Sequence, residues 1–129
     1  LLRSVIESKY MEFHAVGIDF IMEIPDPISP SHIDIVDLSA VLTTFLDNAL
    51  LRAHGQENSL VRLSYYQSGE VQFLSVETTL SQDSAEALHK AYENHLSINE
   101  QIEDIMERYP QSKLSFKNDK FIYRQQFEY

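Results

Sequence analysis

Residues 37–54, with the sequence DLSAVLTTFLDNALLRAH, decide the fold. Apolar side chains recur there three or four positions apart, which is the spacing that places them on one face of a helix. Gly55 follows directly, and glycine is common just past a helix end. The stretch therefore predicts a long amphipathic helix, whose apolar face consists of Leu38, Val41, Leu42, Phe45, Leu46, Ala49 and Leu50.

The chain ahead of this helix reads as a helix, a strand and a loop. Apolar residues recur at helical spacing over residues 1–16, and Gly17 stands where that helix would stop. Residues 18–24 alternate as a strand does, with Ile18, Phe20, Met22 and Ile24 on one face. Three prolines within residues 25–30 then mark a loop.

Two strands are expected after the long helix, over residues 60–66 and 71–76. Gln67-Ser68-Gly69-Glu70 between them reads as a hairpin turn, so the two strands should pair antiparallel. Residues 78–97 are polar, with helix-favouring residues but no strong apolar stripe. They predict a loosely packed helix or lid.

The last part of the chain predicts a helix and a second hairpin. Apolar residues favour a helix over 98–109, and Pro110 blocks its continuation. Residues 113–117 and 121–127 read as two strands joined around Asn118-Asp119. The order helix, strand, helix, strand, strand, helix, helix, strand, strand implies an α+β fold of two layers in a single domain over residues 1–129.

Composition narrows the classes of function. Twenty acidic against ten basic residues give a net charge of -10, which repels nucleic acid phosphates and anionic membrane surfaces. No cysteine is present, so neither a disulfide framework nor a thiolate zinc site can form. The longest apolar stretches fall far short of the roughly 20 residues that span a bilayer. Because the sequence begins without methionine and within a helical pattern, we expect a fragment of a longer chain.

The long helix and its flanks resemble the ATP-binding fold shared by histidine kinases, gyrase and a class of heat-shock chaperones. Ile33–Leu38, running into Leu42–Ala49, is similar to the N-box helix of that fold. In peptide-pheromone-sensing histidine kinases a segment like Gly17–Pro25 precedes the N-box. The domain of those kinases ends with a segment like Tyr109-Pro110 followed by Asp119–Ile122. The chain thus resembles the C-terminal ATP-binding (HATPase, GHKL-type) domain of such a kinase over nearly its whole length, which implies a Bergerat-type two-layer sandwich.

The resemblance also implies a set of ligand residues. The N-box aims one side-chain oxygen at a magnesium ion that bridges the nucleotide phosphates, and Asn48 matches that position. The alternative is that Asn48 only caps or hydrogen-bonds within its helix. Thr44 stands where the family usually has a second asparagine or an acid, and Leu51 where it tends to have a charged residue near the phosphates. Thr78 or Thr79 would replace the residue that contacts the adenine amino group.

The second glycine-rich box of the family has no counterpart here. Its glycines let backbone N–H groups approach phosphate oxygens at a helix N-terminus. Counted back from Tyr109-Pro110, those glycines fall on Leu96 and Ile98. No glycine occurs between Val71 and Tyr129, whatever the alignment. We therefore expect ATP binding to be weakened or lost.

Three functional hypotheses follow. In the first, the domain binds Mg-ATP and presents the γ-phosphate to a histidine of its own dimer, as the protein-histidine kinase (transferase) of a two-component, quorum-sensing system. In the second, it is a pseudokinase-type interaction or dimerisation domain that regulates a signalling partner without ATP. In the third, it is an unrelated α+β binding domain. Nucleotide affinity separates the first two, and the fold separates the third.

Partners and location follow from the same resemblance. It implies a response regulator as partner, and a homodimer through upstream helices, of which residues 1–16 would be the end. It also implies a cytoplasmic domain in a membrane-anchored sensor protein. No residue is assigned as catalytic. His14 is flanked by Phe13 and Ala15, and these neighbours do not resemble those of a phosphoacceptor histidine. We expect the phosphoacceptor histidine in a segment upstream.

Other groups of chemically active side chains have simpler explanations. His89 and Glu93 have the spacing of two metal ligands on a helix, but His95 does not share their face, so a solvated surface is favoured. The acidic run over residues 99–104 is expected to cover an exposed helix face, with docking of a basic partner as the alternative. Aromatic side chains on the predicted strands are assigned to the core.

Overall fold

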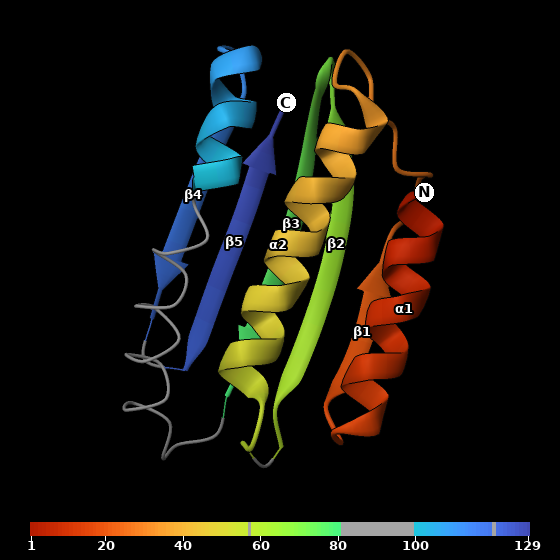
Figure 1. The fold of residues 1–129 in the computed structure, drawn as a ribbon, viewed down its shortest axis with the longest axis vertical. Coiled ribbons are helices and arrows are strands. Elements are labelled where there is room, and N and C mark those ends of the chain that lie inside the picture. Colours follow the sequence, from red (N-terminus) through yellow and green to blue (C-terminus); the bar gives the residue numbers. More distant parts are fainter. Residues whose placement is uncertain (57, 81–99, 120) are drawn as a thin grey trace.

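Five strands form one mixed sheet in the computed structural model, which describes residues 1–56, 58–80, 100–119 and 121–129. The strand order is β1-β2-β3-β5-β4 (Figure 1). β1 pairs parallel with β2, and the other neighbours pair antiparallel. The strands are β1 (Asp19–Glu23), β2 (Leu60–Ser68), β3 (Val71–Thr79), β4 (Lys113–Asn118) and β5 (Ile122–Glu128).

The predicted long helix is α2 (Ile35–Ala53). It begins two residues before the predicted Asp37, because the Asp34 side chain accepts a hydrogen bond from the Val36 N–H at 2.8 Å and caps the first turn. The predicted apolar face is the buried face, with Leu50 half-buried at its margin. Leu38, Val41, Leu42, Phe45, Leu46 and Ala49 are all fully buried.

Helix α1 (Leu2–Ala15) lies beside α2 and over β1. It ends at Ala15, and Gly17 follows just past that end, as predicted, with a φ of +76° that suits a residue without Cβ. The ring of Phe13 stacks on that of Phe20 in β1, with 5.1 Å between centroids. An ion pair of Lys9 with Asp47 joins α1 to α2. Figure 1 shows α1, α2 and the helical residues 100–108 on the same side of the sheet.

The sheet thus has an inner face against the helices and an outer face without them. Side chains alternate between the faces along each strand. A ladder of charges crosses the outer face: Arg62 lies 3.5 Å from Glu23 and 3.6 Å from Glu77, and Arg124 Nη2 lies 2.7 Å from Glu77. The outer face is therefore a solvated surface, and the core forms between the sheet and the helices, in two layers as predicted.

Several boundaries differ from the prediction. Gln67 and Ser68 belong to β2, because Ser68 pairs with Val71 and leaves a turn of two residues with Gly69 at φ +65°. Thr78 and Thr79 belong to β3 and not to a polar lid, because they pair with β2 and β5. The rest of the proposed lid, residues 81–97, lies outside the described residues.

The helical stretch 100–108 ends one residue before the predicted end at 109, and residues 98 and 99 lie outside the described part of the chain. It packs Ile102 and Ile105 into the core. It is also tied to the start of α2, where Asp37 accepts hydrogen bonds from Arg108 Nη2 at 2.7 Å and from the Tyr109 hydroxyl at 2.6 Å.

Candidate functional site

Five buried polar or amphipathic side chains gather between α2 and the inner face of the sheet. They come from one face of α2 and from the facing strands β3 and β5. On the helix, residues four apart lie one above the other, and on the sheet Thr78 is the direct partner of Tyr123. We call this group the inner polar cluster; its members are Asn48, Arg52, Thr78, Tyr123 and Gln125, none more than 2% exposed.

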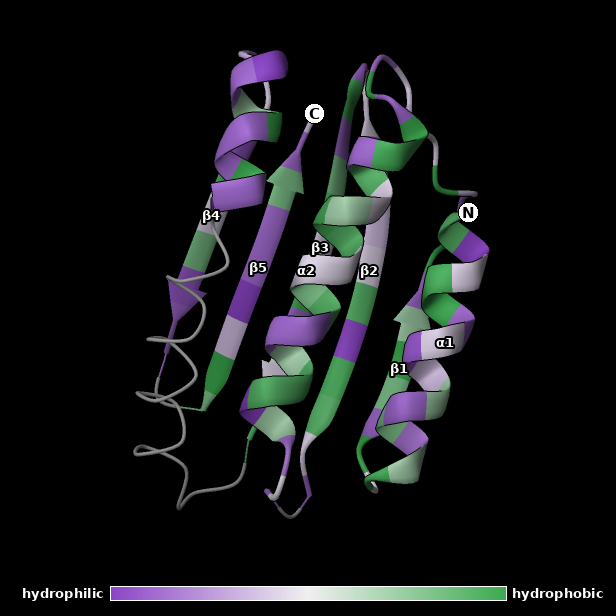
Figure 2. Ribbon diagram, in the orientation of Figure 1, coloured by the Kyte–Doolittle hydropathy of each residue, from purple (hydrophilic) through white to green (hydrophobic). Residues whose placement is uncertain are grey.

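Asn48 and Gln125 join the helix to the sheet by hydrogen bonds. The Asn48 Nδ2 donates to Gln125 Oε1 at 2.9 Å, and Gln125 Nε2 donates to the backbone oxygen of Phe45 at 2.7 Å. Gln125 therefore uses both ends of its amide on α2. The middle of β5 is hydrophilic (Figure 2), and of Arg124, Gln125 and Gln126 only Gln125 lies on the buried face.

Arg52 and Tyr123 form a second link between the same two elements. The guanidinium carbon of Arg52 lies 3.6 Å from the centroid of the Tyr123 ring, which is the geometry of a cation–π contact. Arg52 is 1% exposed. Burial lowers the pKa of its guanidinium, and Tyr123 opposes that shift. A planar, desolvated guanidinium is suited to bidentate binding of a phosphate or carboxylate.

The structure brings three of the predicted ligand residues to the inner side. Asn48 is in the cluster, and Thr44 is buried one turn before it on α2. Thr78 is fully buried on the inner face, and its hydroxyl has no hydrogen-bond partner among the described residues. Thr79 follows it in the strand and points to the outer face. Of the two threonines proposed for adenine recognition, Thr78 is thus the one that faces α2.

Leu51, at the position where the family tends to have a charged residue near the phosphates, brings no side chain to the inner polar cluster. Leu51 is 47% exposed and turns away from the sheet, whereas Arg52, one position later, is buried beside Asn48. Sequence reasoning missed Arg52, although its spacing of four from Asn48 could have shown that both share a face. The assignment of Tyr123 to the core is confirmed, since it is fully buried. Gln125, a polar residue on an inward position of β5, was missed.

The remaining candidates lie elsewhere. Leu96 and Ile98 of the second glycine box, and the metal candidates His89, Glu93 and His95, fall outside the described residues. Over the described parts of the chain, no three His, Cys, Asp or Glu side chains are placed to hold a metal ion. His14 is exposed on α1 and stacks on Tyr10 with 6.2 Å between ring centroids. None of the described helices is long and apolar enough to cross a membrane.

The chemistry of the cluster can be compared with what a magnesium nucleotide requires. Asn48 and Thr78 offer neutral amide and hydroxyl groups, and the five-residue cluster contains no carboxylate. Arg52 adds a positive charge one helical turn from Asn48, which attracts a phosphate and repels a divalent cation. The side chains of the cluster therefore fit the anionic phosphates of a nucleotide better than they fit the metal ion.

Comparison of the fold with solved structures places it in a known class. The catalytic domain of histidine kinase ThkA matches with a TM-score of 0.75 at 18% identity, over 98% of this chain and 87% of that one. Full-length ShkA in complex with AMPPNP matches at 0.68 and 20% identity, and ThkA in complex with the response regulator TrrA at 0.67 and 20%. Both matches cover 98% of this chain. They cover only 28% of the ShkA chain and 39% of the ThkA chain in that complex, so this chain spans less than half of either protein.

The chain therefore has the fold of a histidine kinase catalytic domain of GHKL type. No protein-family model matches the sequence, and no curated protein matches it. At these identities the likeness defines the architecture alone, and this is the fold that the first two hypotheses require.

Proposed function

We propose that this chain is the ATP-binding (catalytic) domain of a sensor histidine kinase, of the peptide-pheromone-sensing type, in which nucleotide binding is weakened or lost. The observation that carries the proposal is the place of Asn48 in a histidine-kinase fold. It is buried on the inner face of the helix that resembles the N-box, where that family has its nucleotide ligand. Arg52 and Thr78 share that interior.

Each residue has a distinct role in this proposal. The Asn48 amide oxygen is the candidate ligand of the magnesium ion, and the Arg52 guanidinium binds phosphate oxygens. Thr78 faces the base with a hydroxyl, and Thr44 supports Asn48 one turn earlier on α2. Bound Mg-ATP would supply the γ-phosphoryl group for transfer to a histidine on a segment outside residues 1–129.

The contacts within the cluster oppose nucleotide binding. A phosphate that takes Arg52 as its ligand must displace Tyr123 from the guanidinium. A desolvated cation–π contact is worth about 2 kcal/mol. Its loss corresponds to roughly a 30-fold loss of affinity. The missing glycines after Val71 remove backbone phosphate contacts in addition.

The second candidate function is a non-catalytic interaction domain that regulates a signalling partner without ATP. The same packing of Tyr123 against Arg52 favours it, because these two buried side chains fill space between α2 and β5. In either case we propose a response regulator as partner, as in the ThkA complex with TrrA. We further propose a homodimer through upstream helices, to which residues 1–16 lead, in a membrane-anchored sensor with this domain on the cytoplasmic side.

Calorimetric titration with Mg-ATP and Mg-ADP tests the proposal. Binding that Asn48→Ala weakens at least tenfold, while the exposed control Leu51→Ala leaves it unchanged, supports a nucleotide site at Asn48. Equal affinity of wild type and Asn48→Ala refutes the role of Asn48. No detectable binding to the folded wild type supports the non-catalytic candidate.

A further inference from the structure

The sheet has two edge strands, and they differ in how well they are protected against pairing with a further strand. β4 carries Lys113 and Lys117, charged side chains of the kind that discourage such pairing. β1 carries no lysine, arginine or proline, and its Ile21 and Met22 are 39% and 52% exposed. Within the described part of the chain β1 pairs only with β2, so its other edge presents backbone N–H and C=O groups to a partner.

A groove follows this open edge, between β1 and α1, which lies over β1 at the rim of the sheet (Figure 1). It consists of two hollows, of about 480 Å³ and about 260 Å³, that the same two elements line. We call it the edge groove. Its apolar side chains come from successive turns of α1 and from the inner side of β1 and the residue after it: Leu2, Ile6, Tyr10, Phe20, Met22 and Ile24.

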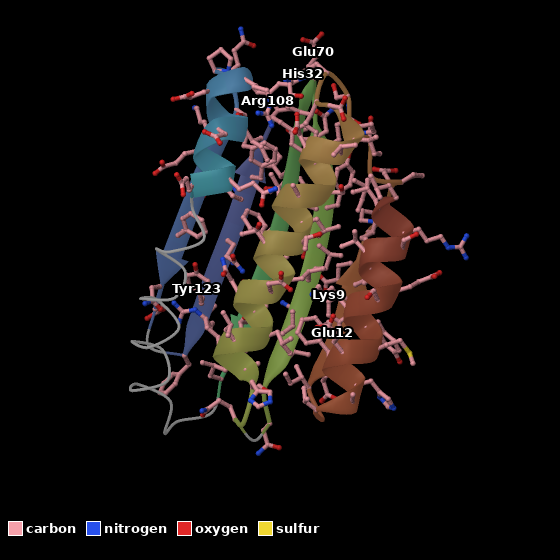
Figure 3. The ribbon with its side chains drawn as sticks, in the orientation of Figure 1. Lys9, Glu12, His32, Glu70, Arg108 and Tyr123 are labelled. Atoms are coloured by element: carbon pink, nitrogen blue, oxygen red, sulfur yellow. The ribbon has the colours of Figure 1, made fainter. Side chains whose placement is uncertain are left out.

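The way α1 packs keeps the edge groove open. Figure 3 shows Lys9 and Glu12 on the side of α1 that faces α2, where Lys9 forms its ion pair with Asp47. Tyr10 lies about 100° further around the helix than Lys9, on the side of the open edge. It is exposed, and the centroid of its ring lies 6.4 Å from that of Phe20. The groove therefore has an apolar wall on α1 and an apolar floor on β1.

We propose that the edge groove binds an extended segment of a partner protein, which joins the sheet as a further strand beside β1. Successive side chains of such a strand point to opposite faces of the sheet. One set enters the groove between α1 and the inner side of β1, and must therefore be apolar. The other set lies on the outer face, beside Asp19, Ile21 and Glu23.

The carboxylates of β1 define the chemistry of that outer set. Asp19 and Glu23 are exposed on the outer face on either side of Ile21, and Arg62 approaches Glu23 no closer than 3.5 Å. Opposite charges directly across a strand pair are favourable, and like charges are unfavourable. The partner segment thus carries lysine or arginine at alternate positions, between apolar residues.

The same charges argue against a second copy of this chain as the occupant. Two β1 strands related by a twofold axis must pair antiparallel. The register centred on Ile21, which uses the whole strand, sets Asp19 of each copy opposite Glu23 of the other. Both cross-strand pairs would then consist of like charges.

This proposal does not rest on the proposed function, because the edge groove shares no residue with the inner polar cluster. It is tested by NMR titration of the isotope-labelled domain with the acetylated and amidated peptide KVKIKVK, which alternates basic and apolar residues. We expect the backbone amide signals of Phe20, Ile21 and Met22 to shift in a saturable way. The acidic peptide EVEIEVE should bind at least tenfold more weakly. So should KKVIVKK, which has the composition of the first peptide without its alternation.

Met22→Gln provides the decisive variant. It keeps the length of the side chain and places an amide in the groove, which the bound strand would bury without a hydrogen-bond partner. We expect the affinity for KVKIKVK to fall at least fivefold, with little change in melting temperature, because Met22 is half exposed in the free domain. Met11→Gln is the matched control: Met11 is 66% exposed on α1 and lines neither hollow, so this variant should bind as wild type.

A second pair of variants tests the charges. Glu23→Gln should weaken KVKIKVK at least threefold, whereas Glu70→Gln, which makes the same change of net charge at the turn between β2 and β3, should not. The proposal is overturned if KVKIKVK causes no saturable shift at residues 20–22, if the acidic or the non-alternating peptide binds as well, or if Met22→Gln binds unchanged. It is also overturned if the domain alone dimerises in sedimentation and Met22→Gln abolishes the dimer, since the occupant is then a second copy.

Discussion

Replacing Gln125 by leucine tests whether the α2–β5 hydrogen bonds hold the two layers together. The side chain is fully buried and makes two hydrogen bonds with α2, one from Asn48 and one to the Phe45 oxygen. The Phe45 oxygen also accepts within its helix, so losing Gln125 there costs about 1 kcal/mol. Removing the acceptor of the buried Asn48 N–H costs about 1–3 kcal/mol more.

Burial of the additional apolar surface of leucine offsets part of this loss. We therefore expect Gln125→Leu to lower the free energy of unfolding by about 2–3 kcal/mol. Urea denaturation followed by circular dichroism measures this difference from the shift of the midpoint at constant slope. Gln126→Leu is the matched control, because the neighbouring glutamine lies on the outer face of the same strand and should change stability by no more than about 0.5 kcal/mol.

A double variant, Asn48→Leu with Gln125→Leu, sharpens the test. Replacing both partners of a buried hydrogen bond by apolar groups costs less than the sum of the two single replacements. We expect a coupling energy of about 1 kcal/mol or more in that direction. If Gln125→Leu destabilises no more than Gln126→Leu, or if the two single effects add without coupling, the bond does not join the layers as described.

Three further predictions follow from other contacts. Arg52→Met should change the free energy of unfolding by less than about 1 kcal/mol in urea denaturation, because the buried charge is removed together with its contact. Tyr123→Leu removes the ring and leaves the charge buried, so it should cost about 3 kcal/mol. Equal effects of the two variants would contradict this. Hydrogen bonds from Arg108, and to a lesser degree from Tyr109, lower the pKa of Asp37 below 3.8 in the folded state. The ionised Asp37 therefore stabilises the fold above pH 3.8, and this stabilisation is lost as the pH falls through the lowered folded-state pKa. Asp37→Asn should therefore flatten the loss of stability in that window, measured by urea midpoints against pH, and an unchanged slope would refute it. Gly69→Ala should raise the unfolding rate and cost about 1 kcal/mol, because φ is +65° there, and a neutral result would contradict the turn assignment.

The sequence predicted most helices and strands because their signals are local. The apolar spacing in residues 37–54 is a property of a single helix, and the structure confirms its buried face. Glycines at 17, 55 and 69 mark ends and turns, and all three have positive φ. The prediction was wrong where a strand extends beyond its apolar residues. Thr78 and Thr79 are polar, but backbone pairing with β2 and β5 makes them part of β3.

The candidate site was predicted less completely than the fold. Asn48 was found from the helix, but Gln125, which binds it, lies 77 residues away in the sequence. No pattern within either segment indicates that the two amides meet.

By itself the sequence determined the elements, the two-layer architecture and the inward face of α2, because these depend on side-chain periodicity along one segment. Only the tertiary structure decided that Thr78 faces inward and Thr79 outward, and that Gln125 of β5 meets Asn48. The physical reason is strand register. A shift of one residue in β3 or β5 would exchange the inner and outer side chains, and only the pairing of all five strands against the helices fixes it.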